Sequence, residues 1–109
     1  DVISLSLGAG AFKNSCDSEP LAIVSNDAVS QGVVVLAASG NDGYVNAISS
    51  PACASDVIAV GAVDKDDSRT IYSNESRELD IVAPGTSITS TVPNNSCLLC
   101  DSSGFNTLS

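Results

Sequence analysis

Two short apolar runs on either side of one helical pattern constrain the fold more than any other feature of the sequence. Residues 2–7 are apolar and rich in β-branched side chains, and the run stops at the glycines of residues 8–10, as a buried strand does when it enters a sharp turn. Residues 33–38 form an uninterrupted apolar run, which is typical of a parallel strand covered on both faces. With a helix between them, this order predicts two parallel strands joined by a crossover.

The predicted helix covers residues 20–31. Pro20 suits the first turn, where a helix does not need the N–H that proline lacks, and Gly32 suits the position after the last turn. Apolar side chains recur at spacings of three and four and predict the buried stripe, which consists of Leu21, Val24, Ala28 and Val29.

Later apolar runs complete the predicted sheet. Residues 57–63 and 79–83 are short and strand-like, and residues 88–92 suit one more strand. The sequence therefore predicts an α/β fold with a mainly parallel sheet. One helix cannot cover both faces of such a sheet, so we expect a partial domain whose missing cover comes from other segments.

The composition excludes several classes of function. The 109 residues fit one small domain, and 4 Lys plus Arg against 13 Asp plus Glu give a net charge of −9, which argues against a nucleic-acid partner. No apolar stretch approaches the roughly 18 residues of a membrane span, so no membrane partner is expected. Because the chain contains no histidine, it cannot by itself supply the usual base of a Ser-His-Asp or Cys-His site.

Several segments, in their order and spacing, resemble the subtilisin-like serine protease family (subtilases). They are VISLSLG at residues 2–8, VLAASGNDG at 35–43, SPA at 50–52, VIAVGA at 57–62, YSN at 72–74 and LDIVAPG at 79–85. The resemblance implies a three-layer αβα architecture, of which residues 1–109 are a fragment of a single peptidase domain. It also implies a secreted serine endopeptidase that hydrolyses the peptide bonds of peptide or protein substrates.

Asn41 is the residue through which the resemblance implies chemistry. It follows the predicted strand 33–38, at the edge of the sheet where α/β folds bind their ligands, and in the family this amide donates a hydrogen bond to the oxyanion of the tetrahedral intermediate. From the residues alone, an asparagine that only shapes a turn is the alternative. The resemblance also implies the substrate-binding walls, which are Ser6, Leu7, Gly8, Ala9, Ala38, Ser39 and Gly40. The family more often has glycine at the position of Ala9, which bears on fine specificity.

The family's catalytic triad is expected outside this sequence. By resemblance, the Asp and His motifs precede the strand at residue 2, and the nucleophile follows a segment like residues 104–109. Ser109 is therefore not the nucleophile. We expect the isolated chain to be inactive and its partners to be the remaining segments of the protease domain. The alternatives are a non-catalytic peptide-binding or protein-interaction module with part of the fold, and an unrelated α/β binding domain.

A calcium ion is the one cofactor that the resemblance suggests. In the proteinase K-like branch of the family, two backbone carbonyls and an Asp bind calcium, and the matching residues here are Ser55, Val57 and Asp80. Oxygen ligands of this kind suit calcium. The alternative is that Asp80 is simply a carboxylate at the end of a strand.

Four cysteines, an even count, favour an oxidising compartment and thus a secreted or extracellular protein. Cys97 and Cys100 form a C-x-x-C motif, which by itself admits redox, zinc and disulfide interpretations. Some secreted bacterial subtilases have cysteines at similar positions, and this resemblance implies a disulfide between Cys16 and Cys53, and with it a second one between Cys97 and Cys100. Two glycosylation sequons, at residues 74–76 and 94–96, are interpreted as chance occurrences.

Overall fold

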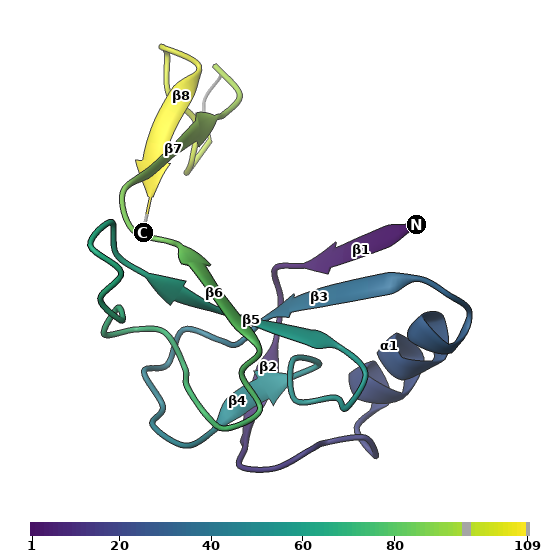
Figure 1. Ribbon diagram of the computed structural model, residues 1–109. Coiled ribbons are helices and arrows are strands. Elements are labelled where there is room, and N and C mark those ends of the chain that lie inside the picture. Colours follow the sequence, from purple (N-terminus) through teal and green to yellow (C-terminus); the bar gives the residue numbers. More distant parts are fainter. Residues whose placement is uncertain (95–96, 109) are drawn as a thin grey trace.

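The structure, a computed structural model, describes residues 1–94 and 97–108 and is built on a four-stranded parallel sheet. The strands lie in the order β1 (Val2–Leu5), β3 (Val34–Ala38), β5 (Ile58–Val63) and β6 (Ile81–Pro84) (Figure 1). All three pairs in this sheet are parallel. The predicted α/β fold with a mainly parallel sheet is therefore confirmed, with strands somewhat shorter than the apolar runs that predicted them.

The helix α1 (Pro20–Ser30) has the predicted ends. Pro20 lies in its first turn, and Gly32, at a φ of 85°, follows the capping residue Gln31. The predicted buried stripe is partly wrong, because Leu21 and Val24 are 43% and 61% exposed whereas Ala22 and Ser25 are buried. Small side chains on the buried face let α1 lie close to the sheet beside β3, and Ala28 and Val29 pack against the core as predicted.

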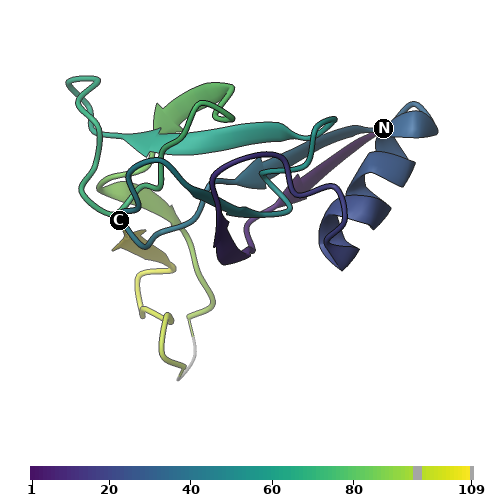
Figure 2. The ribbon, with the colours of Figure 1, turned by 90° about the horizontal axis from the view of Figure 1, so that it is seen from below.

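Two small antiparallel pairs complete the fold. β2 (Ala9–Phe12) pairs with β4 (Ile48–Ser50), and β7 (Ile88–Thr91) pairs with β8 (Phe105–Leu108). The turned view shows α1 at one end of the sheet and the β7–β8 hairpin projecting away from it (Figure 2). Of these strands, the sequence predicted only β7.

The core lies where β3 and β5 meet α1 and β4. It is filled mostly by small side chains and by one disulfide, and its buried members are Cys16, Ala22, Val35, Ala37, Ile48, Ala52, Cys53, Ala54, Val57 and Ala59. The Cys16–Cys53 disulfide joins the segment before α1 to the segment after β4, and Cys97–Cys100 closes a short loop between β7 and β8. Both predicted disulfides are confirmed, and Cys97 and Cys100, bonded to each other, are not free thiolates for zinc.

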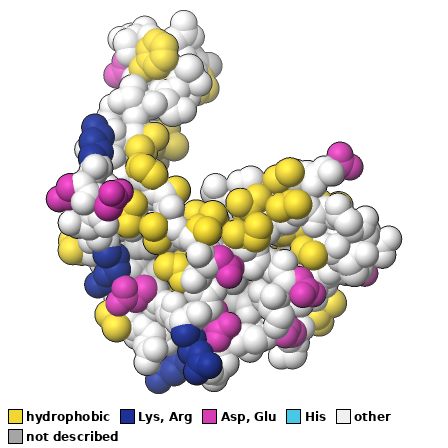
Figure 3. Space-filling view, in the orientation of Figure 1, with side chains coloured by type: hydrophobic (Ala, Val, Ile, Leu, Met, Phe, Trp, Pro, Cys, Tyr) yellow, Lys and Arg dark blue, Asp and Glu magenta, His cyan; other side chains and the backbone are white. Residues whose placement is uncertain are grey.

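Much of the sheet's apolar surface stays exposed. Val2, Val34, Ile81 and Val82 are between 45% and 67% exposed, and hydrophobic side chains gather along the hollow between β1 and the β7–β8 hairpin (Figure 3). Among the described residues, α1 is the sole helix, so only one helical layer of the predicted three-layer architecture is present. No helix in this part of the chain is long and apolar enough to cross a membrane.

Candidate functional site

Asn41 lies in the turn that follows β3, on the wall of the main cleft. Its side chain is exposed, whereas Ser39, two residues earlier, is buried. The cleft has a volume of about 540 Å³ and is lined by Ser6, Leu7, Gly8, Ala9, Gly10, Ala11, Ala38, Gly40, Asn41, Asp42, Tyr44 and Ser49. The structure thus brings Asn41 together with six of the seven predicted substrate-binding residues.

Ser39, the seventh predicted residue, lines a neighbouring cleft on the other side of the same turn. That cleft, of about 320 Å³, shares four residues with the first and is otherwise formed by the carboxyl ends of β5 and β6 and the residues near them. The four shared residues are Ser6, Ala38, Gly40 and Asn41. Asn41 therefore lies between two clefts at the carboxyl edge of a parallel sheet, where ligands of α/β folds bind.

The turn that carries Asn41 is held by Asn74, which the sequence analysis did not identify as a site residue. The Oδ1 atom of Asn74 accepts the backbone N–H groups of Asp42 and Tyr44, each at 3.0 Å. Its Nδ2 atom donates to the carbonyl oxygen of Ser39 at 3.1 Å. The Asn74 side chain is completely buried, the bond to Ser39 is buried and those to Asp42 and Tyr44 are partly buried, so these bonds tie the turn to the interior of the fold.

Ser49 joins this turn to the opposite wall of the cleft. Its hydroxyl donates to the carbonyl oxygen of Gly10 at 3.0 Å and accepts from Nδ2 of Asn74 at 3.4 Å. Ser49 lies on β4, which pairs with β2 and so fixes the segment that follows residues 6–8. The two walls are therefore connected by strand pairing and by a buried polar side chain.

The chemical groups in the cleft suit binding better than proton transfer. Backbone groups, small side chains and the Asn41 amide line most of it, and Asp42 is the one charged residue among the described residues of its lining. An amide can donate a hydrogen bond to a carbonyl oxygen, but it cannot remove a proton from a nucleophile. Since the sequence has no histidine, the site can orient and polarise a carbonyl group without supplying the usual base.

Asp80, the one carboxylate of the predicted calcium site, lies beside the start of β5. Its Oδ2 atom accepts the N–H of Ala59 at 2.7 Å, and its own N–H donates to the carbonyl oxygen of Ala59 at 3.1 Å. Among the described residues, no hydrogen bond is found at its other carboxylate oxygen, and no group of three or more His, Cys, Asp or Glu side chains could hold a metal ion. A site here would therefore depend on one carboxylate oxygen and on backbone carbonyls, a donor set that suits calcium.

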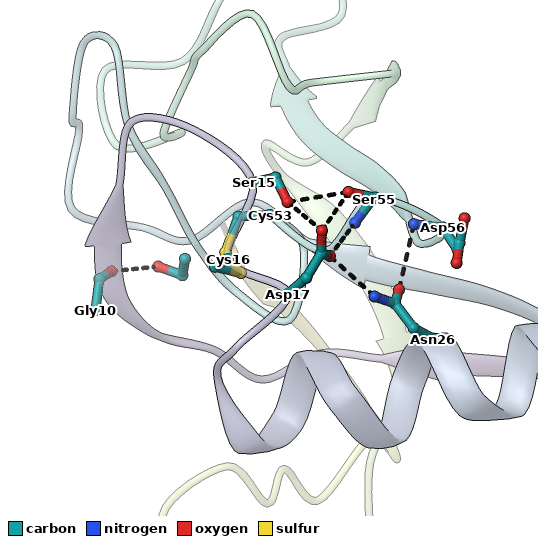
Figure 4. The surroundings of a disulfide bond; sticks show 9 residues. Gly10, Ser15, Cys16, Asp17, Asn26, Cys53, Ser55 and Asp56 are labelled. Atoms are coloured by element: carbon teal, nitrogen blue, oxygen red, sulfur yellow. Dashed lines mark hydrogen bonds between the residues drawn. A yellow bond between two sulfur atoms is a disulfide. The ribbon is translucent and has the colours of Figure 1, made fainter.

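Ser55, which the calcium prediction also names, takes part in a polar cluster next to the Cys16–Cys53 disulfide (Figure 4). Asp17 accepts hydrogen bonds from the hydroxyls of Ser15 and Ser55 at 2.5 and 2.6 Å. It also accepts the N–H of Ser55 and the amide of Asn26 at 2.8 and 2.9 Å. These bonds, that of Ser15 above all, hold the pKa of the Asp17 carboxyl well below its usual range.

The two glycosylation sequons and Ser109 lie in different parts of the chain, and the structure describes only the first sequon. Asn74, the acceptor of the first sequon, is buried with both amide atoms hydrogen-bonded, so the folded chain does not present it for glycosylation. The second sequon includes residues 95 and 96, which lie outside the described residues, and so does Ser109.

Comparison with known proteins gives matches over nearly the whole chain. The model of the subtilase family matches residues 1–107. Subtilisin E of Bacillus subtilis (strain 168) is 44% identical over 96 residues, which are 85% of this chain and 24% of that protein. The minor extracellular protease Epr of the same strain is 39% identical over 94 residues, 86% of this chain and 14% of Epr.

A solved structure gives a similar result. The prenylagaramide maturation protease PagA superposes with a TM-score of 0.78 at 28% sequence identity, and the match covers 99% of this chain and 36% of PagA. The chain thus spans about a third or less of the length of the relatives it matches.

Proposed function

Because the chain belongs to the subtilase family, we propose that residues 1–109 are the central segment of one subtilisin-like serine endopeptidase domain. In this proposal the segment supplies the oxyanion-hole amide and the walls of the substrate cleft. The remaining segments of the domain supply the catalytic Asp, His and Ser residues.

The position of Asn41 is the observation that carries the proposal. When a serine attacks a peptide carbonyl, negative charge develops on the carbonyl oxygen, and a donor already aimed at that oxygen stabilises the transition state. The exposed Asn41 belongs to a turn that hydrogen bonds to the buried Asn74 side chain hold in place. A donor on a turn that is held before the reaction needs little reorganisation during it, and this supports an oxyanion-hole role for Asn41.

The two walls of the cleft support an extended peptide as substrate. Residues 6–9 follow β1, which is an edge strand of the parallel sheet, and Gly8 and Ala9 are small enough for another backbone to approach. Ala38 and Gly40 line the facing wall. A peptide added alongside residues 6–9 would pair through its main chain, and its scissile carbonyl would face Asn41.

Secretion is part of the same proposal. Disulfides persist in oxidising compartments, and the structure contains two of them. The name of one relative, Epr, describes it as extracellular. Both observations support an extracellular or secreted location for this protein.

An Asn41→Ala substitution tests the oxyanion role. We would use a hybrid protease, defined as subtilisin E in which residues 1–107 of this chain replace the matching segment, and measure kcat and KM with a chromogenic peptide. Loss of the oxyanion-hole amide is known from a subtilisin to lower kcat by about 10²- to 10³-fold, and we expect a loss of this size here. KM should change little, because the amide acts mainly in the transition state.

Asn14→Ala is the matched control, because Asn14 is an exposed asparagine outside the cleft, and we expect it to leave kcat unchanged. If Asn41→Ala also left kcat unchanged, the oxyanion role would be wrong. A hybrid that binds the peptide without hydrolysing it would favour the non-catalytic binding module instead.

We also propose a structural calcium ion bound by Asp80 with the backbone carbonyls of Ser55 and Val57. One carboxylate oxygen of Asp80 makes no hydrogen bond within the described part of the chain, and this supports the site. A bound ion would raise the melting temperature of the chain, because it binds the folded state alone. Melting with calcium and with a chelator should differ for the chain and should not differ for Asp80→Asn. An equal response of both proteins would contradict the site.

A further inference from the structure

The Asn74 side chain makes most of its hydrogen bonds to the segment around Asn41. Its Oδ1 atom, with two lone pairs, accepts two N–H groups, those of Asp42 and Tyr44. Nδ2 donates to the Ser39 carbonyl, with longer contacts to the Ser49 hydroxyl and to Oδ2 of Asp42. Because the Asn74 side chain is completely buried, these partners, and not solvent, determine the orientation of its amide.

These bonds lie on both sides of Asn41. Ser39 and Gly40 precede it, and Asp42 and Tyr44 follow it. The backbone of Asn74 adds two bonds to the preceding side, because its N–H donates to the Gly40 carbonyl at 3.0 Å and its carbonyl accepts the Ser39 hydroxyl at 3.0 Å. None of the bonds is made to Asn41 itself, whose side chain stays exposed at the cleft. Asn74 therefore sets the path of the turn while leaving the Asn41 amide free.

Gly40 provides an independent sign of this close contact. Its φ is 107°, a conformation that favours glycine, and a Cβ atom there would collide with Nδ2 of Asn74 and with the Ser49 hydroxyl. The turn therefore lies so close to the Asn74 amide that it leaves no room for a side chain at residue 40.

We propose that Asn74 is a positioning residue for the oxyanion hole, which acts by holding the turn of residues 39–44 so that the Asn41 amide points into the cleft. The inference rests on the proposed function for the role of Asn41. A shift of about 1 Å in a catalytic group can cost about 10²-fold in rate, so the loss of Asn74 should lower kcat even though Asn74 touches no substrate.

The first test uses the 109-residue chain and amide hydrogen exchange. In Asn74→Ala the N–H groups of Asp42 and Tyr44 lose their acceptor, so we expect their exchange to be at least about 10-fold faster. The N–H of Ser39, which donates to the Val60 carbonyl within the main sheet, should keep its protection. Equal protection of Asp42 and Tyr44 in both proteins would overturn the inference, and so would equal loss at all three amides.

Thr70→Val is the matched control for the loss of a buried polar side chain. Thr70 is buried, and its hydroxyl donates to the Ala62 carbonyl and accepts the N–H of Ser73 without contacting the turn. The Thr70→Val variant should therefore leave the hydrogen exchange rates of the Asp42 and Tyr44 amides unchanged relative to those of the other amides.

The second test measures kcat and KM in the hybrid protease. Asn74→Ala should lower kcat by about 10-fold or more with KM within about 2-fold, and Thr70→Val should change neither. If Asn74 acts through Asn41, its substitution should change kcat by less than about 2-fold when Asn41 is already alanine. A full further loss in the double variant would mean a merely structural role and would overturn the inference.

The two proposals fail in different ways. If Asn41→Ala leaves kcat unchanged, the proposed oxyanion role is wrong, whatever Asn74 does. If Asn41→Ala lowers kcat and Asn74→Ala does not, the oxyanion role stands and the positioning role of Asn74 is wrong.

Discussion

Two short polar side chains connect segments that lie far apart in the sequence. Asn74 holds a turn that begins 35 residues earlier, and Asp17 holds Ser55, 38 residues later. Each makes several hydrogen bonds through one small group, so a single substitution removes all of them at once. Asn74 is buried and its amide does not titrate, whereas Asp17 is exposed and its carboxyl does. Only the bonds of Asp17 are therefore expected to depend on pH.

The stability of the chain should fall in acid partly through Asp17. Its hydrogen bonds lower the carboxyl pKa in the folded state, whereas the unfolded chain takes up the proton near the ordinary pKa of about 3.9. The stabilisation is therefore complete above about pH 5 and is lost progressively as the pH falls below about 4. Melting temperatures measured from pH 7 to pH 2.5 should fall more steeply for the chain than for Asp17→Asn.

Asp56→Asn controls for the loss of one negative charge in the same place. The Asp56 carboxylate makes none of the bonds of the Asp17 cluster (Figure 4). Asp66 and Asp101, whose pKa values are lowered by Ser68 and Ser103 in their own turns, contribute equally to all three proteins. Parallel pH profiles for the chain and Asp17→Asn would contradict the assignment.

Among the elements, those with a strong local pattern could be predicted from the sequence. β3 and β5 are continuous apolar runs that end at polar or glycine residues, and α1 has a proline at its start and a glycine after its end. The sequence did not predict β2 and β4, because both strands are short and consist mostly of alanine, glycine and serine. Their strand character comes from pairing with each other across almost 40 residues, and no local pattern records such a contact.

The buried face of α1 shows a second limit of pattern reasoning. Spacing selects residues that share a face, but it does not reveal how close the sheet lies. Here Ala22 and Ser25 face the core and allow a close approach, whereas the larger Leu21 and Val24 point away. Exposed leucine and valine on the outer face suit a helix that further protein covers.

The candidate site likewise contains one residue that could be predicted from the sequence and one that could not. Asn41 could be predicted because the segment of residues 35–43 resembles that of the subtilases, and its place soon after an apolar strand puts it at the carboxyl edge of the sheet. Asn74 could not be predicted as its support, because its partners at residues 39–44 are 30 or more residues away. The YSN segment carried the family resemblance, but no local signal shows which backbone groups its amide binds.

At the scale of the whole molecule, the described part of the chain has a formed cleft and an incompletely covered sheet. The cleft is lined by the Asn41 amide and the sequence has no histidine, and apolar side chains of β1, β3 and β6 are exposed to solvent. Both features point to the same requirement. In the proposed function, further segments of a protease domain cover the sheet and bring the nucleophile and its base to the cleft.

A fluorophosphonate probe tests this requirement, because it labels a serine only when a neighbouring base makes that serine strongly nucleophilic. The 109-residue chain has many serines but no histidine, so we expect no specific labelling at neutral pH. The hybrid protease, which combines the same residues with the triad of subtilisin E, should be labelled at one serine outside them. Peptide mapping by mass spectrometry identifies the labelled residue. Stoichiometric labelling of any serine in the isolated chain would contradict the proposal that the nucleophile and its base lie outside residues 1–109.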